Sequence, residues 1–156
     1  MIKKSISDNE TLLLHEFLPY RLAVLAKAIG KSFSQTYDRK FGITNQQWRI
    51  IFALARKKNC SASFVVQHAA LSKVQVSRGI AGLIEMKLVR RHSDTDDRRN
   101  SVLSLTKKGL KTYQQIVPEA LKFEANLKSS LDNREIQALD RLLSKLMEKT
   151  DPKLYF

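Results

Sequence analysis

Two helix-start signals, separated by a single short apolar pattern, constrain the fold of this chain more than any other feature of its sequence. Ser61 can cap a short helix whose inward residues are Val65 and Ala69. Ser72, with Gln75 three residues later, forms the capping-box pattern that starts a second helix. About three residues join the two helices, which is the connection of a helix-turn-helix. The sequence therefore predicts that motif in the middle of the chain.

Further helices are predicted on both sides of the motif. An apolar stripe at helical spacing covers residues 18–40, and Pro19 suits the first turn of that helix. Pro118 falls inside a later helical pattern, which it should kink or divide. Capping residues predict the other helix starts at Thr44, Thr106 and Asp132.

The hydrophobic period changes after residue 88. Residues 88–91 and 101–105 are alternating or β-branched, and the polar stretch 94–100 separates them, so we expect two strands joined by a loop. The predicted fold class is mainly α with a small β wing, that is, a winged helix-turn-helix flanked by N- and C-terminal dimerisation helices.

The leucine-rich stripes at both ends of the chain would be exposed on a monomer. We expect a twofold dimer in which the terminal helices of two chains pack together. The alternative is that these helices fold back on their own module. The predicted division is residues 1–42 and 107–156 for the dimerisation region, with 43–106 as the DNA-binding region.

The charge of the chain points to a polyanionic partner. Its 156 residues include 28 Lys and Arg against 15 Asp and Glu, a net charge of +13. Nucleic acid is the first expectation and an anionic membrane surface the second, while a merely basic soluble surface is the plain alternative. No apolar run reaches the length of a membrane span, because Lys27 interrupts the longest candidate. We expect a cytoplasmic protein with no membrane partner.

Several chemical functions have no basis in the sequence. Cys60 is the single cysteine, and the three histidines show no metal-ligand spacing, so neither a metal nor another cofactor is expected. The chain has no glycine-rich phosphate loop and no nucleophile elbow, and an enzyme is therefore not expected. Cys60 is either a redox-sensing thiol or an ordinary small apolar side chain.

The second helix of the motif has one face suited to DNA. With Val76, Ile80 and Leu83 inward, its outer face is basic, amide-bearing and small. Arginine can pair with guanine, glutamine with adenine, and serine with phosphate oxygens. The small residues Gly79, Ala81 and Gly82 would let the helix backbone approach the duplex. The residues expected to contact DNA here are Ser72, Lys73, Gln75, Ser77 and Arg78.

The loop between the predicted strands adds a second contact. Arg98 or Arg99 could enter a minor groove, while Asp97 would pair with a neighbouring arginine and fix the loop. The alternative is a solvated turn of mixed charge. A sequence-indifferent nucleoid or RNA-binding protein is the alternative function, since it shares the charge without needing contacts to base edges.

The order of these motifs resembles the MarR family of bacterial transcription regulators over residues 17–148. Asp97-Arg98-Arg99, followed by residues 102–106 and Gly109, looks like the family's wing signature. Residues 47–49, 71–78 and 88–91 resemble its second helix, its recognition helix and the start of its wing. The resemblance implies a homodimeric repressor or activator on a pseudo-palindromic operator, often released by a small aromatic acid. Of the two roles, we expect that of a repressor. It also implies that Arg99 is the minor-groove arginine and Asp97 its brace.

Two residues depart from the family pattern. Lys87 stands where glycine, asparagine or aspartate usually ends the recognition helix, so the helix end and the start of the wing can differ. Phe64 occupies a position that is commonly acidic, and it is either a packing contact or part of a ligand or partner surface.

The family's effector pocket lies where its dimerisation helices meet the DNA-binding module. An aromatic carboxylate needs a guanidinium for its charge and aromatic walls for its ring. The alternative is that the arginines of this region form surface or interdomain salt bridges. The candidate effector residues are Arg21, Arg49, Trp48 and Tyr20, with His15 as a weaker one.

Overall fold

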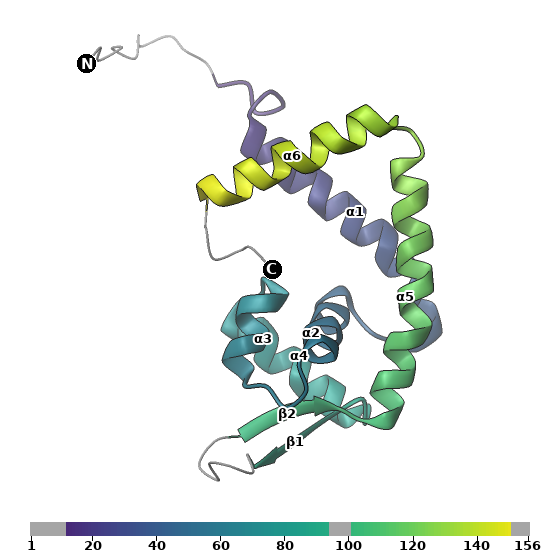
Figure 1. Ribbon diagram of the computed structural model, residues 1–156. Helices are drawn as coiled ribbons and strands as arrows, with labels where there is room; N and C mark the ends of the chain where they lie inside the picture. The colour runs from purple at the N-terminus through teal and green to yellow at the C-terminus, as the bar shows by residue number, and fades with distance from the viewer. Residues whose placement is uncertain (1–11, 94–100, 151–156) are drawn as a thin grey trace, which may run out of the picture.

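A computed structural model describes residues 12–93 and 101–150 of the chain (Figure 1). A lower module contains three short helices and a β-hairpin, and one long helix rises from the hairpin to the terminal helices at the other end. The elements in chain order are α1 (Leu18–Phe41), α2 (Asn45–Arg56), α3 (Ala62–Ala69), α4 (Lys73–Glu85), β1 (Val89–Ser93), β2 (Ser101–Leu105), α5 (Lys107–Lys128) and α6 (Asn133–Thr150). The predicted fold class, mainly α with a small β wing, is confirmed.

Helix α2 lies at the centre of the core. It contacts α1, α3, α4, α5 and β2, and most of its apolar residues are buried. Trp48 on this helix lies within 6.2 Å, between ring centroids, of Phe33 and Tyr37 on α1 and of Tyr113 on α5. These aromatic contacts fasten the lower module to the two long helices.

The predicted capping residues form the hydrogen bonds expected of them. The Thr44 side chain accepts from the Gln47 amide at 3.2 Å, and the Gln47 side chain accepts from the Thr44 amide at 2.8 Å. The other predicted caps likewise accept hydrogen bonds from backbone amides of their first helical turns, at Ser61, Ser72, Thr106 and Asp132. These local signals place the helix starts correctly.

Pro118 does not divide its helix. Helix α5 is continuous from Lys107 to Lys128 with Pro118 inside it. The proline removes one backbone donor and leaves the carbonyl four residues earlier, at Gln114, without its helical partner. Both residues are exposed, so water can satisfy that carbonyl.

The start of α5 is bound tightly to the turn that follows α4. Thr106 Oγ1 donates to the Lys87 carbonyl at 2.7 Å, and the Lys108 ammonium donates to the Met86 carbonyl at 3.0 Å. A Cβ on Gly109 would collide with the Leu88 carbonyl, so only glycine allows the helix to approach this closely. The end of α4 and the first turn of α5 therefore form one rigid junction.

Lys87, which stands where the family pattern has glycine, asparagine or aspartate, adopts a left-handed backbone conformation. Its φ is 60°, a conformation that glycine or asparagine adopts at lower cost. Helix α4 thus ends at Glu85, and the following strand begins at Val89, one residue later than the sequence pattern predicts.

None of the described helices is long and apolar enough to cross a bilayer.

Candidate nucleic-acid interface and adjoining pocket

Helix α4 presents the predicted polar face. Lys73, Ser77 and Arg78 are exposed, whereas Ile80 and Leu83 are buried against the module. The Ser72 capping box holds the N-terminal turn of the helix in place, where unpaired amides favour an anion. The result is an exposed basic ridge on a helix whose other face is fixed in the core.

The two glycines of α4 face the protein and not the outside, so the prediction that they allow close approach to DNA is wrong. A Cβ on Gly79 would collide with the Ile50 side chain, and one on Gly82 would lie 2.8 Å from Gln47 Nε2. Both neighbours belong to α2. The glycines therefore allow α4 to pack closely on α2, a requirement that one helix's sequence does not reveal.

Gln75 has a structural task that competes with base reading. Its side-chain oxygen accepts a hydrogen bond from the Ser72 amide at 2.9 Å, and the residue is half-buried. A bidentate contact to adenine uses both the oxygen and the amino group of the glutamine amide. With its oxygen held by the cap, Gln75 offers DNA chiefly its amino group.

The wing residues Asp97, Arg98 and Arg99 lie outside the described residues.

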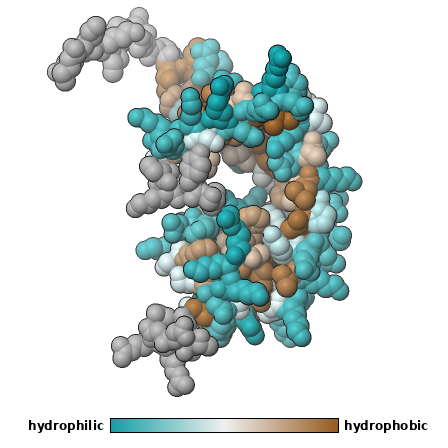
Figure 2. Space-filling model, viewed as in Figure 1, coloured by the Kyte–Doolittle hydropathy of each residue, from teal (hydrophilic) through white to brown (hydrophobic). Residues whose placement is uncertain are grey.

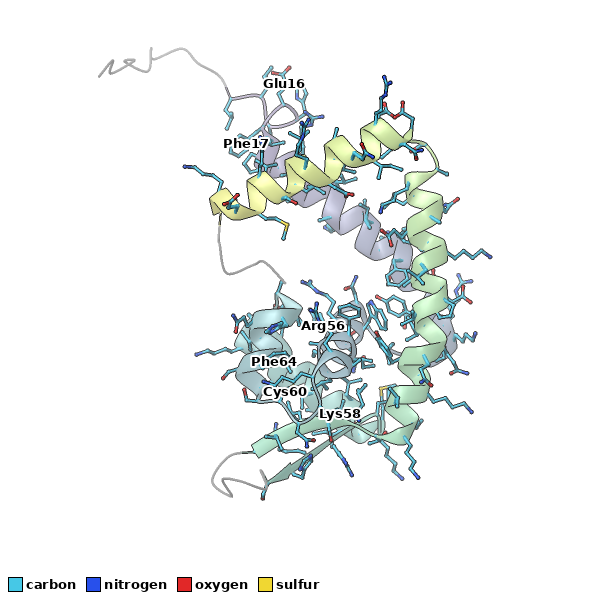
Figure 3. The ribbon with its side chains drawn as sticks, in the orientation of Figure 1. Glu16, Phe17, Arg56, Lys58, Cys60 and Phe64 are labelled. Atoms are coloured by element: carbon cyan, nitrogen blue, oxygen red, sulfur yellow. The ribbon has the colours of Figure 1, made fainter. Side chains whose placement is uncertain are left out.

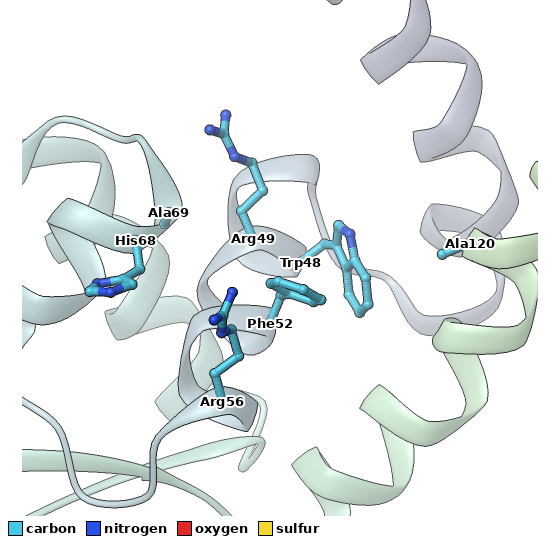
Figure 4. A pocket seen from close by; sticks show the side chains of 7 residues that line it. All are labelled: Trp48, Arg49, Phe52, Arg56, His68, Ala69 and Ala120. Atoms are coloured by element: carbon cyan, nitrogen blue, oxygen red, sulfur yellow. The ribbon is translucent and has the colours of Figure 1, made fainter. Parts of the chain in front are cut away.

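A pocket of about 490 Å³ opens between α2, α3 and α5 (Figure 4). Arg49 and Arg56 project from α2 toward the same side, with the rings of Trp48 and Phe52 beside them. His68, Ala69 and Ala120 complete the lining from α3 and α5. Two guanidinium groups beside aromatic walls can hold the carboxylate and the ring of a small aromatic acid.

The structure brings together only part of the predicted effector set. Trp48 and Arg49 line the pocket, but Tyr20, Arg21 and His15 do not. These three are exposed near the start of α1, where the labelled Phe17 lies far from Arg56 in Figure 3. His15 lies 3.9 Å from the carboxylate of Glu16, its chain neighbour.

Sequence reasoning missed five of the seven lining residues, and three of them, Phe52, Arg56 and His68, carry the aromatic or basic chemistry of the pocket. Phe52 and Arg56 follow Arg49 at intervals of three and four residues, which is the spacing of one helix face. That signal was present in the sequence. His68 is on a different helix, and no pattern along the chain connects it with α2.

Arg49 also supports the turn of the helix-turn-helix. Its Nη2 donates to the Ala70 carbonyl at 3.1 Å, and Ala70 has a left-handed φ of 47°. Burial lowers the pKa of Arg49 from its ordinary value, although an arginine keeps its charge at neutral pH. The guanidinium therefore links the pocket to the segment that leads into α4.

The Tyr37 hydroxyl lies buried behind this region. No hydrogen-bond partner reaches it among the described residues. Burial, together with the Asp38 charge, raises the pKa of Tyr37 to about 12, and the nearby Arg49 partly opposes this rise.

Phe64 lies on α3, and Cys60 lies just before that helix, beside the hairpin (Figure 3). The Phe64 ring stacks on His68 with 3.8 Å between centroids, and the Lys57 ammonium lies 5.1 Å from its centre. Of the two interpretations of Phe64, the structure supports the packing contact. Cys60 is buried and pairs with Leu103 in a β-bridge, and burial raises the pKa of its thiol. These features favour an ordinary buried thiol over a reactive one.

A helix-turn-helix with an exposed basic helix, followed by a β-hairpin, defines a winged-helix DNA-binding protein. A sequence model described as the MarR family matches residues 41–100. Over 136 residues the chain is 23% identical to the HTH-type transcriptional regulator YwoH of Bacillus subtilis, covering 87% of this chain and 98% of the relative. The HTH-type transcriptional regulator FarR of Neisseria gonorrhoeae is 28% identical over 70% of this chain and 75% of its own length.

Solved structures agree with the sequence comparisons. A MarR/EmrR family transcriptional regulator from Acinetobacter sp. ADP1 superposes with a TM-score of 0.82 at 28% identity, covering 90% of this chain and 99% of that one. BpsR of Bordetella bronchiseptica, whose DNA binding is regulated by 6-hydroxynicotinic acid, gives 0.79 at 25% identity over 89% and 99%. The chain is therefore similar to proteins of the MarR family, and the relatives and solved structures named here are transcriptional regulators.

Proposed function

We propose that this protein is a sequence-specific transcriptional repressor that binds a pseudo-palindromic DNA site as a homodimer. The observation that carries the proposal is the exposed basic face of α4, opposite a face fixed in the core. A helix presented in this way fits the major groove of a duplex. Because the partner is chromosomal DNA, we place its action in the cytoplasm.

Each contact has a proposed role. Arg78 reads a guanine edge, and Gln75 offers its amino group to a base. Ser72, Lys73 and Ser77 hold phosphates, which fix the register of the helix on the duplex. From the family resemblance, Arg98 and Arg99 reach a minor groove and Asp97 braces the loop.

The terminal helices support the proposed dimer. No residue of α6 is buried, and four leucines on it are at least 38% exposed. The first half of α1 is likewise exposed, and Figure 2 shows apolar side chains at the surface along α1 and α5. Apolar stripes of this extent need a partner, and a second copy supplies the same stripes in a twofold arrangement. Residues 1–42 and 107–156 then form the dimer contact, and 43–106 form the DNA-binding region.

A leucine substitution tests the dimer. Replacing Leu142 and Leu146 with lysine should convert the protein to a monomer in sedimentation equilibrium, because both charges would enter the apolar contact. Replacing exposed Lys145 and Lys149 on the same helix with glutamine is the matched control. A double-lysine variant that remains dimeric would contradict this part of the proposal.

We propose further that a small aromatic carboxylate in the α2 pocket releases the DNA. The two guanidinium groups and the aromatic rings of the pocket support this ligand class. The related BpsR, which responds to an aromatic carboxylic acid, supports it as well.

Selection of bound fragments from random DNA tests the DNA-binding proposal. We expect two half-sites about one helical turn apart, and Arg78→Ala should cost about 1–3 kcal/mol and relax base choice at one position in each half. If the selected duplex and a scrambled duplex bind equally well, the protein is a sequence-indifferent binder, and the proposal fails.

Calorimetric titration with 6-hydroxynicotinic acid and a panel of benzoic acids tests the effector proposal. Arg56→Gln should weaken binding at least tenfold, because it removes one charge-assisted contact. Arg21→Ala is the control, since Arg21 lies outside the pocket. Equal loss in both variants, or loss only in Arg21→Ala, would place the ligand elsewhere. Arg56 is a cleaner probe than Arg49, which also holds the Ala70 carbonyl.

A further inference from the structure

A second groove, of about 460 Å³, shares no lining residue with the pocket beside α2. It runs between α3 and α4 and ends at β1. Its floor is aliphatic, and its polar lining consists of Ser63, Gln67, Lys73, Ser77 and Arg91. Lys73 and Ser77 belong to the proposed DNA-binding face, so the groove continues that face toward the wing.

The register of the hairpin directs Arg91 to this groove. Arg91 pairs with the buried Leu103, on the sheet face that packs against the helices. Its neighbours Arg90 and His92 point to the opposite face, where both lie within hydrogen-bond distance of Ser104 Oγ, at 3.0 and 3.3 Å. Strand alternation therefore separates Arg91 from the other basic residues of the strand.

The groove is electropositive from several sources. Lys73 and Arg91 line it, no carboxylate does, and neither cation pairs with a carboxylate within residues 12–93 and 101–150. Ser63 is in the first turn of α3 and Lys73 in the first turn of α4, so the positive ends of two helices lie near the same opening. Hydroxyl groups from Ser63 and Ser77 add donors that suit phosphate oxygens.

We infer that this groove seats one phosphate of the DNA backbone, held by Arg91 and Lys73 with help from the two serine hydroxyls. Arg91 is then a positioning residue that fixes the register of the wing strand and of α4 on the same DNA strand. The inference rests on the proposed DNA-binding function and extends the DNA contact from α4 to the base of the wing. Because a phosphate carries no sequence information, Arg91 contributes affinity and not base choice.

The test uses the duplex recovered by selection and a scrambled duplex of equal length, each at several salt concentrations. Arg91→Gln should weaken both complexes about tenfold, reduce the slope of log K against log salt by about 0.9, and leave base preference unchanged. Arg91→Lys should keep most of the slope, because the charge remains. Arg134→Gln, on exposed α6, removes one positive charge far from the groove and should change nothing.

A chemical change in the DNA isolates the contact. Methylphosphonate substitution at successive positions removes one backbone charge at a time. One position should weaken the wild-type protein about tenfold and leave Arg91→Gln almost unaffected, since the variant has already lost that contact.

The outcomes separate the inference from the function on which it rests. If Arg91→Gln keeps the wild-type salt slope while Arg78→Ala still alters base choice, the phosphate seat is wrong and the DNA-reading function stands. If the wild-type protein does not distinguish the selected from the scrambled duplex, the sequence-reading function fails. The salt slope of Arg91→Gln and the methylphosphonate series still decide the phosphate seat in that case. A thermal melt of each variant guards against loss of folding.

Discussion

Replacing Gly109 with alanine provides a sharp test of how α5 is joined to the end of α4. Gly109 lies inside the first turn of α5 and is buried. From helix propensity alone, alanine at a helical glycine should stabilise the fold by about 1 kcal/mol. The structure predicts the opposite sign, because the new Cβ would collide with the Leu88 carbonyl, a backbone atom that cannot rotate away.

The size of the effect follows from what the Leu88 carbonyl does. It accepts a hydrogen bond from the Thr106 amide at 3.0 Å, whereas the Thr106 hydroxyl proton goes mainly to the closer Lys87 carbonyl. Moving the Leu88 carbonyl weakens the amide bond, at about 0.5–1.5 kcal/mol, and overpacking adds about 1–3 kcal/mol. After the gain in propensity of about 1 kcal/mol is subtracted, we expect Gly109→Ala to destabilise the protein by about 0.5–3.5 kcal/mol.

Urea unfolding, followed by circular dichroism at one fixed protein concentration, measures this change. Fixed concentration matters because the stability of a dimer depends on it. Gly82→Ala is the control, since its Cβ would meet only the tip of the flexible Gln47 side chain and no backbone atom. Displacing that tip costs at most its capping bond to the Thr44 amide, about 0.5–1.5 kcal/mol, which the gain in helix propensity of about 1 kcal/mol offsets, so we expect a change of no more than about 0.5 kcal/mol. A Gly109→Ala protein as stable as the wild type would refute the reasoning.

Three further predictions concern single side chains. Lys87→Gly should raise the free energy of unfolding by about 1 kcal/mol, because glycine adopts the left-handed φ without strain, and an unchanged urea midpoint would count against it. Tyr37→Phe should be neutral or stabilising, since it removes a buried hydroxyl without a partner, and a loss of more than about 1 kcal/mol would reveal a partner for it. The folded-state pKa of Cys60 is raised, so its contribution to stability is complete below the unfolded pKa of about 8.5 and declines as the pH rises above it. The urea midpoint should therefore fall more between pH 7.5 and 9.5 in the wild type than in Cys60→Ala, and equal falls would contradict the prediction.

The features that sequence reasoning placed well are local. The Ser72 capping box needs only Gln75 three residues away, and the alternation of 101–105 needs only the strand itself. Short-range hydrogen bonds and hydrophobic period determine these elements, and both can be read along the chain. The same logic explains why the outer and inner faces of α4 were predicted correctly.

The features that sequence reasoning missed depend on contacts between residues that lie far apart in the sequence. Gly79 was assigned to DNA approach because nothing along α4 shows that Ile50 lies against it. Arg21 and Arg49 were grouped by the helices that carry them, yet Arg21 lies near the start of the 24-residue α1, whereas Arg49 lines a pocket formed by α2, α3 and α5. Pro118 was expected to kink or divide α5, and the helix is not divided. The exposed position, which allows water to replace the lost hydrogen bond, is a tertiary property that the sequence does not show.

The unbroken course of α5 has a mechanical consequence. Its 22 residues make a rod about 33 Å long, and hydrogen bonds fix the lower end of this rod to the turn that follows α4. In the proposed dimer, a tilt of about 5° at the upper end of such a rod displaces its lower end by about 3 Å. A change of angle too small to disturb the core would thus alter the distance between the two copies of α4. The two helices would then no longer match successive turns of the duplex.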